Sequence, residues 1–136
     1  METIRQQKEG DIYELWFRLA FKDLIKNKKI TVAVRPGIRK CPAPKCTNEN
    51  DKAVIRILLK PGDEARGLWP VFDDFKTEVT IKKIIIKPLK DLQTADLADC
   101  SPDCQTPELA RLHLALIYNQ LFSDDDVISI VHFEYL

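Results

Sequence analysis

The chain has 136 residues, of which 45% are hydrophobic and 31% charged, and its 21 Lys or Arg residues are balanced by 21 Asp or Glu residues. This length and composition predict one soluble globular domain with a core of its own. No apolar run approaches the roughly 18 residues of a membrane span, and the polar residues 1–10 lack the apolar segment of a secretory signal. We therefore expect no membrane partner, a cytoplasmic location, a polar leader over residues 1–10 and a single domain over residues 11–136.

Strands and helices are predicted in the order β, α, β, β, β, α, α, β. Alternating or β-branched runs predict strands at residues 12–17, 30–35, 53–59, 77–86 and 127–136. Helices are expected at residues 18–27, at 95–98 with Thr94 as the N-cap, and from Pro107 onward with Thr106 as the N-cap. Residues 36–51 predict a loop and residues 64–74 an irregular segment. The order predicts an α+β domain with a small, mostly antiparallel sheet.

The helix that begins at Pro107 carries two apolar rows. They are Leu109, Leu112 and Leu116 on one row, and Ala110, Leu114 and Ile117 on the next. Rows at this spacing predict a broad buried face. His113 and His132 have no Cys, His or Asp neighbours at ligand spacing, so both are expected to be structural.

Charge is segregated along the chain. Residues 22–60 contain eleven cations and three acids, whereas residues 91–136 contain nine acids and one cation. This asymmetry favours a polyanionic partner. The alternative is that the two regions lie side by side and form solvated ion pairs, each of which contributes little.

Basic side chains surround the predicted strand at residues 30–35, where they could bind phosphate. The candidate ligands for RNA or a nucleoside are Lys26, Lys28, Lys29, Arg35, Arg39, Lys40 and the neighbouring Lys45. Trp69 or Phe72 could stack on a base. The alternative is a solvated cationic face, with Trp69 folded onto the core.

The four cysteines form two closely spaced pairs, Cys41 with Cys46 and Cys100 with Cys104. Closely spaced cysteines can share a zinc ion, although two intervening residues is the commonest spacing and these pairs have four and three. A structural zinc site, a disulfide and separate thiols all stay open, and no cofactor is firmly implied. No glycine-rich phosphate loop, nucleophile elbow or zinc-protease motif occurs.

Several residues, in this order along the chain, resemble the ASCH (activating signal cointegrator homology) domains. The matches are Phe21 with Ile25, Thr31 with Arg35, the segment 89–94, Glu108-Leu109 with Ile117-Tyr118, and Val131 to Phe133. The resemblance covers roughly residues 12–136. It implies a PUA-like fold, a small β-barrel or sheet with two or three flanking helices, and an association with RNA.

The resemblance also implies a comparison with the amidohydrolases of that family, which remove the acetyl group of N4-acetylcytidine with a lysine, a threonine and a glutamate. Here the lysine position falls on Ile30 and the threonine position on Ala33, and the glutamate position offers only Asp103 or Asp99. Lys28 and Lys29 are near the lysine position, but a shift of one residue in a strand reverses the side chain's direction. Lys29 and Asp103 are thus the only catalytic candidates, and they are weak ones.

These observations favour a non-catalytic domain that binds RNA or a modified nucleoside beside Arg35. Lys29 and Arg35 would hold a phosphate or a base edge, and Asp103 would accept a hydrogen bond from an exocyclic amine. One alternative is an amidohydrolase-like enzyme that acts on N4-acetylcytidine or RNA. Another is a protein-interaction module that uses the acidic helix face and the segment 69–72. The oligomeric state is left open.

Overall fold

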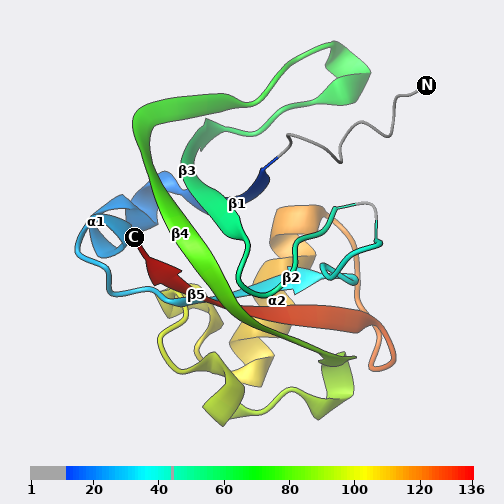
Figure 1. Cartoon of the computed structure of the whole chain (residues 1–136). Helices are drawn as coiled ribbons and strands as arrows, with labels where there is room; N and C mark the ends of the chain where they lie inside the picture. The colour runs from blue at the N-terminus through cyan, green and yellow to red at the C-terminus, as the bar shows by residue number, and fades with distance from the viewer. Residues whose placement is uncertain (1–11, 44) are drawn as a thin grey trace.

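The computed structural model describes residues 12–43 and 45–136 of the chain (Figure 1). The five strands are β1 (Tyr13–Arg18), β2 (Val32–Pro36), β3 (Lys52–Lys60), β4 (Val71–Pro88) and β5 (Val127–Tyr135). The α-helices are α1 (Lys22–Lys26) and α2 (Pro107–Tyr118). Short 3-10 helices connect them: η2 (Leu19–Phe21), η3 (Glu64–Arg66), η4 (Leu89–Asp91), η5 (Thr94–Leu97) and η6 (Pro102–Cys104). None of the described helices is long and apolar enough to cross a membrane.

The strands form one curled sheet in the order β1-β3-β4-β5-β2. Only β1 and β3 run parallel, and the other neighbours are antiparallel. The long strand β4 pairs first with β3 and then with β5, and its register shifts between Ile81 and Lys83. A bulge of this kind bends a strand and increases its twist, which lets the sheet curl into a half-barrel. The predicted α+β, mostly antiparallel and PUA-like architecture is confirmed.

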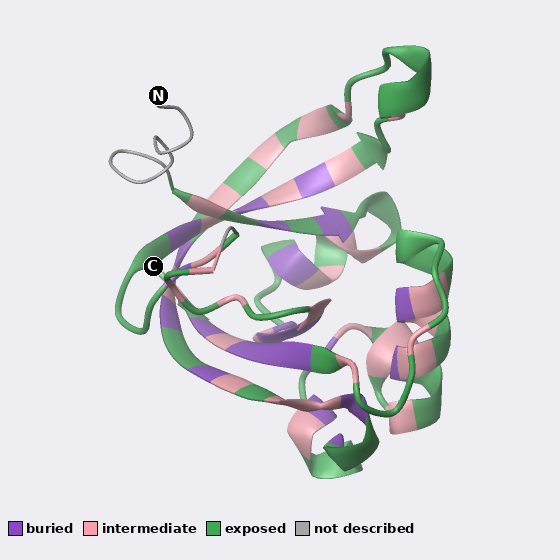
Figure 2. Cartoon of the chain, turned by 90° about the vertical axis from the view of Figure 1, so that its right-hand side faces the viewer, coloured by how far each residue is buried: buried purple, intermediate pink, exposed green. Residues whose placement is uncertain are grey.

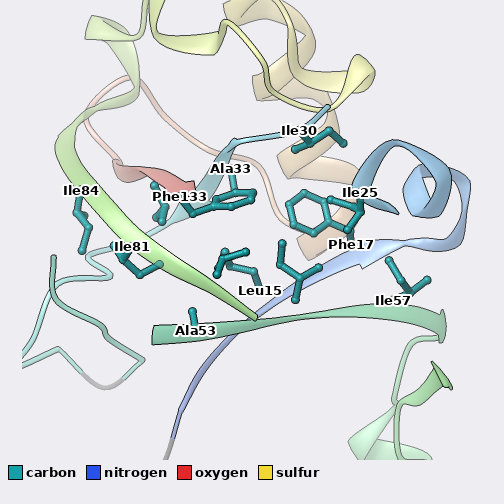
Figure 3. Packing of buried hydrophobic residues seen from close by; sticks show 13 residues of the cluster. Leu15, Phe17, Ile25, Ile30, Ala33, Ala53, Ile57, Ile81, Ile84 and Phe133 are labelled. Carbon is teal, nitrogen blue, oxygen red and sulfur yellow. The ribbon is translucent and has the colours of Figure 1, made fainter. Parts of the chain in front are cut away.

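Two cores lie on the two faces of the sheet. One fills the inside of the curl, where Leu15, Phe17 and Phe133 meet Ile25 of α1 (Figure 3). The other lies under α2 and η5 and contains residues from β2 and β5. Because β2 and β5 are covered on both faces, their sequences are nearly continuous apolar runs rather than alternating ones.

The predicted strands are confirmed, with shifts at their ends, but three local predictions were wrong. Residues 18–27 do not form one helix, because the chain leaves β1 through η2 before α1 begins. The segment 64–74 is not irregular throughout, since β4 already begins at Val71 and continues the hairpin with β3. The N-cap of η5 is Gln93 rather than Thr94, and it forms a capping box with Asp96. Thr106 caps α2 as predicted, since its Oγ1 accepts the Leu109 N–H at 3.2 Å.

The broad buried face predicted for α2 was also wrong. Ala110 and Leu114 are buried against the sheet, but Leu109, Leu112 and Leu116 are exposed. In Figure 2 the buried residues of the helix at the right-hand edge face the sheet, and exposed residues cover its outer side. Ile117, predicted in the same row as Ala110 and Leu114, is also exposed, so only Ala110 and Leu114 of the two rows are buried against the sheet.

The end of the β3–β4 hairpin extends beyond the rest of the sheet (Figure 1). Trp69 lies in this end and is 85% exposed. The alternative in which Trp69 folds onto the core is therefore wrong.

Candidate functional site

Side chains from three arginines join the edge strand β1 either to the other edge strand, β2, and the loop after it, or to η6. Arg35 of β2 donates a hydrogen bond of 2.8 Å from Nη2 to the Trp16 carbonyl oxygen. Arg39 donates from Nη1 to the Tyr13 hydroxyl at 3.2 Å. Arg18, at the end of β1, forms an ion pair with Asp103 of η6. We call this line of contacts between β1 on one side and β2 and η6 on the other the seam.

Asp103 is held from two sides at one end of the seam. Its carboxylate accepts hydrogen bonds from the Arg18 guanidinium and, at 2.6 Å, from the Ser101 hydroxyl. Burial on its own would raise the pKa of Asp103, but the hydrogen bonds from Ser101 and Cys104 and the charge of Arg18 outweigh it and lower the pKa. Asp103 is therefore ionised at neutral pH. Its side chain is 11% exposed and that of Arg18 is 49% exposed, so the pair presents its cationic member to solvent.

Aromatic rings lie beneath two of the three guanidinium groups of the seam. The Arg35 guanidinium is 5.0 Å from the centroid of the Phe17 ring, and the Arg18 guanidinium is 5.1 Å from that of Phe21. Arg35 also donates to the Val34 carbonyl oxygen at 2.9 Å. The cation–π contacts, together with carbonyl acceptors for Arg35 and the Asp103 carboxylate for Arg18, hold the two guanidinium groups in place. Arg35, which the sequence predicts as a ligand, therefore also joins the edges of the sheet.

A second aromatic group lies beside the seam on the outer face of the sheet. The Trp16 and Phe72 rings meet edge to face, with centroids 4.8 Å apart, and the Arg56 guanidinium covers Phe72 at 3.9 Å. Glu14 accepts a hydrogen bond from Trp16 Nε1 at 2.8 Å and also pairs with Arg56. Trp16 remains partly exposed. It is thus a base-stacking candidate nearer to the seam strands than Trp69.

The predicted basic ligands are not gathered at one point. Lys26, Lys28 and Lys29 precede β2 and are exposed, whereas Arg39 and Lys40 follow it, as does the exposed Lys45. Lys26 Nζ lies 5.8 Å from the centroid of the Phe75 ring. Arg39 donates from Nε to the Pro36 carbonyl oxygen in addition to its bond to Tyr13. Asp103, which the sequence gave with Lys29 as a weak catalytic candidate, forms an ion pair with Arg18.

The cysteines are divided between a disulfide and two thiols. Cys41 and Cys46 are bonded to each other, and Cys100 and Cys104 are free. Burial raises the pKa of Cys100 to about 12 and that of Cys104 to about 11, so both are thiols rather than thiolates at neutral pH. Within residues 12–43 and 45–136 no three His, Cys, Asp or Glu side chains are placed to share a metal ion. The zinc site considered from the sequence is not assembled in this arrangement.

Arg18 and Ser101 are site residues that the sequence reasoning missed. Arg18 is the last residue of the alternating strand β1 and follows the buried Phe17. A charged residue at the end of an alternating run was the signal that could have identified it. Ser101 gave no signal of its own, because its position next to Asp103 becomes informative only once Arg18 is known to lie there.

Comparison with known proteins identifies the fold. No protein-family model matches the sequence, and no curated protein matches it. A crystal structure of a protein from Enterococcus faecalis V583, assigned to DUF984, has a TM-score of 0.57 and 14% identity, with 97% of this chain and 85% of that chain covered. A crystal structure of an ASCH domain from Lactobacillus crispatus JV V101 has a TM-score of 0.56 and 9% identity, with 99% and 86% covered. The fold implied by the resemblance is confirmed.

Proposed function

We propose that this chain, which has the fold of an ASCH domain, binds RNA or a modified nucleoside at the seam without catalysing a reaction. The observation that carries the proposal is the Arg18–Asp103 pair, in which an exposed guanidinium lies next to an ionised carboxylate. A nucleobase presents donors and acceptors side by side on its edge. A guanidinium beside a carboxylate provides the matching acceptor and donors.

Each group at the seam has a distinct part in this proposal. Arg18 binds a phosphate or a base oxygen through its guanidinium fork, and Asp103 accepts a hydrogen bond from an exocyclic amine. Trp16 provides a ring on which a base can stack, since it is partly exposed and lies on β1. Arg35 adds positive charge close by while its contacts to Trp16 and Phe17 hold the strands together.

The remaining candidate ligands would act at longer range. Lys28 and Lys29 lie in the turn before β2, and Lys40 lies beyond its end. Positive charges at both ends of the short strand β2 can bind successive phosphates of a single-stranded RNA that crosses it. We propose that these lysines, with Lys26 and Arg39, make binding salt-dependent and that Trp69 contacts a base farther along the strand.

The two thiols beside the seam are not activated as nucleophiles. Thiolates rather than thiols attack amides, and the raised pKa values of Cys100 and Cys104 keep both protonated. Asp103, one of the two weak catalytic candidates, pairs with Arg18, whose guanidinium does not give up its proton. These features support binding rather than amide hydrolysis.

The direct test is binding of fluorescent single-stranded RNA, followed by anisotropy at low and near-physiological salt, with cytidine and N4-acetylcytidine titrated by calorimetry. We expect Arg18→Ala and Asp103→Asn each to weaken binding, Arg18→Ala by roughly tenfold, the equivalent of about 1.4 kcal/mol for a lost charged hydrogen bond. The matched control is Lys82→Ala, since Lys82 forms an exposed pair with Glu134 on β4 and β5. Equal affinities for all three variants would overturn the proposal. Acetate released from N4-acetylcytidine, and lost in Asp103→Asn, would establish the hydrolase instead.

We also propose a cytoplasmic location, and the cysteines offer a test of it. In a reducing compartment Cys41 and Cys46 are expected to be thiols, although the structure joins them. Cells would be lysed in a thiol-alkylating reagent, and the mass of the peptide that contains both cysteines would be measured by mass spectrometry. Two alkylated cysteines agree with the cytoplasm, and an intact disulfide contradicts it.

A further inference from the structure

The outer side of α2 is apolar where a surface helix is normally polar. Ala110 and Leu114 anchor the helix to the sheet, yet Leu112 and Leu116 on the other side are 52% and 66% exposed, with Leu109 beside them. Surface helices place charged and polar residues on the face away from the core, and a helix that is apolar all round is normally buried. An exposed apolar row of this kind is typical of a surface that contacts another molecule.

A groove continues this apolar surface toward the loop that follows α2. Its volume is about 640 Å³, and Leu92, Leu112, Ala115, Leu121 and Phe122 line it. Leu121, at its border, is 92% exposed. We call the leucine row and this groove together the α2 face. Its apolar residues lie at the centre, and Lys90, Glu108, Arg111 and Asp124 also line the groove.

The border of the α2 face carries both signs of charge. Arg111 pairs with Asp124, and Lys90 pairs with Asp125, in solvent-exposed contacts. Glu108 lies in the first turn of α2 and also borders the groove. A partner with charge of one sign would be attracted by one part of this border and repelled by another. A second copy of the same surface, turned by a two-fold axis, can place cations against acids on both sides.

We propose that the α2 face is the interface of a two-fold symmetric homodimer. Leu109, Leu112 and Leu116 have the three- and four-residue spacing with which two helices pack along a shared row of leucines. If two α2 helices run antiparallel, Leu112 lies near the two-fold axis and Leu109 of one copy approaches Leu116 of the other. Ala115, next to the row, is small enough to let the helices come close. The net charge of zero adds no overall repulsion between copies.

The oligomeric state in solution tests the dimer. Sedimentation equilibrium of the full chain is expected to show a concentration-dependent mass that rises from 15.7 kDa toward twice that value. Leu112→Glu is expected to remain monomeric at every concentration, because it places two carboxylates near the axis. The matched control is Leu59→Glu, which changes an exposed leucine on the hairpin and should leave the dimer intact. Unchanged circular dichroism and thermal unfolding show that both variants are folded, as expected for exposed sites.

Three results would overturn the proposal. They are a wild-type chain that is monomeric at all concentrations, a dimer that survives Leu112→Glu, and a dimer that Leu59→Glu abolishes. A monomer that binds a helix of another protein in the groove would assign the α2 face to a different partner. The antiparallel arrangement has its own test, since Leu112→Cys should form an intermolecular disulfide rapidly under mild oxidation and Leu59→Cys should not. Failure of Leu112→Cys to crosslink in a confirmed dimer would overturn the proposed axis.

Discussion

The guanidinium of Arg35 on β2 donates a hydrogen bond of 2.8 Å to the carbonyl oxygen of Trp16 on β1. The two strands are the opposite edges of the sheet, and each already pairs with another strand on its inner side. A long side chain thus connects two edges that share no backbone ladder. The contact gives the half-barrel a defined width at the point where the proposed ligand binds.

Replacement of Arg35 by Ala is expected to lower the free energy of unfolding by about 1–3 kcal/mol, because the carbonyl oxygens of Trp16 and Val34 lose a charged donor. Arg35→Lys should restore only part of this loss, since one ammonium cannot reproduce the planar fork that reaches both oxygens. Equilibrium denaturation in urea measures both variants. Wild-type midpoints for both would show that the contact does not join the edges.

Ser129 on β5 is a polar side chain with no solvent exposure. Its hydroxyl donates to the Gly37 carbonyl oxygen at 2.7 Å and accepts the Arg39 N–H at 2.9 Å, which fixes the loop after β2. Ser129→Ala is expected to cost about 1–3 kcal/mol, because it leaves both backbone groups without a partner. Ser123→Ala, at an exposed serine, is the control and should unfold like the wild type in the same urea titration. A Ser129→Ala variant as stable as the control would contradict this account.

His132 should make the stability of the fold depend on pH. Burial first, and then the charge of Lys83, lower the pKa of His132, while Asp96 opposes them. Its Nε2 is buried and has no hydrogen-bond partner among the described residues. In the unfolded chain His132 takes up a proton at a pKa of about 6.5. In the folded protein the same protonation is less favourable, because the pKa is lowered. Stability is retained above that pH and is lost as the pH falls through it toward the lower folded value.

Urea titrations between pH 7.5 and about pH 5 test this sign, because the carboxylates titrate mainly below that range. The wild type should become less stable as the pH falls. His132→Gln should lose most of this slope, while His113→Gln, which keeps His132 in place, should retain it. A wild-type slope in His132→Gln would assign the effect to other groups.

Trp69 should contribute almost nothing to the stability of the fold, because it is 85% exposed at the end of the hairpin. Trp69→Ala is expected to change the free energy of unfolding by less than about 0.5 kcal/mol. The chain has two tryptophans, so the emission that remains belongs to Trp16, which contacts Phe72. Acrylamide should quench this remaining emission less than the emission of the wild type. A loss of more than about 1 kcal/mol would show that Trp69 packs on the protein, as surface substitutions rarely cost that much.

Local patterns were sufficient to predict the strands and the start of α2. The run from Ile30 to Arg35 is β-branched, and Thr106 followed by Pro107 is a strong helix start, so neither needed tertiary information. The same reasoning was wrong about Leu112 and Leu116. Helical spacing shows which residues share a row, but only the packed sheet decides which row it covers.

The site was harder to predict than the fold, because its residues come together from distant parts of the chain. Arg18 and Asp103 are 85 residues apart, and neither belongs to a spacing motif. Asp103 was identified only through a family resemblance, whereas Arg35 and Lys29 belonged to the basic segment around the predicted strand and also matched or neighboured positions of the resemblance. Charge density in the segment 22–60 pointed to cations generally but not to the guanidinium that pairs with the acid.

The pairing of β2 with β5 has a consequence for how the chain folds as it is made. Val32 pairs with His132, so β2 lies at the sheet edge next to a strand that follows it by most of the described chain. A ribosome delivers β2 long before β5, and pairing over such a separation is slow because a long loop must close first. Until β5 emerges, β2 exposes Val32, Val34 and its unpaired backbone to the cell. Protein synthesis is therefore the stage at which we expect this chain to be most prone to aggregation.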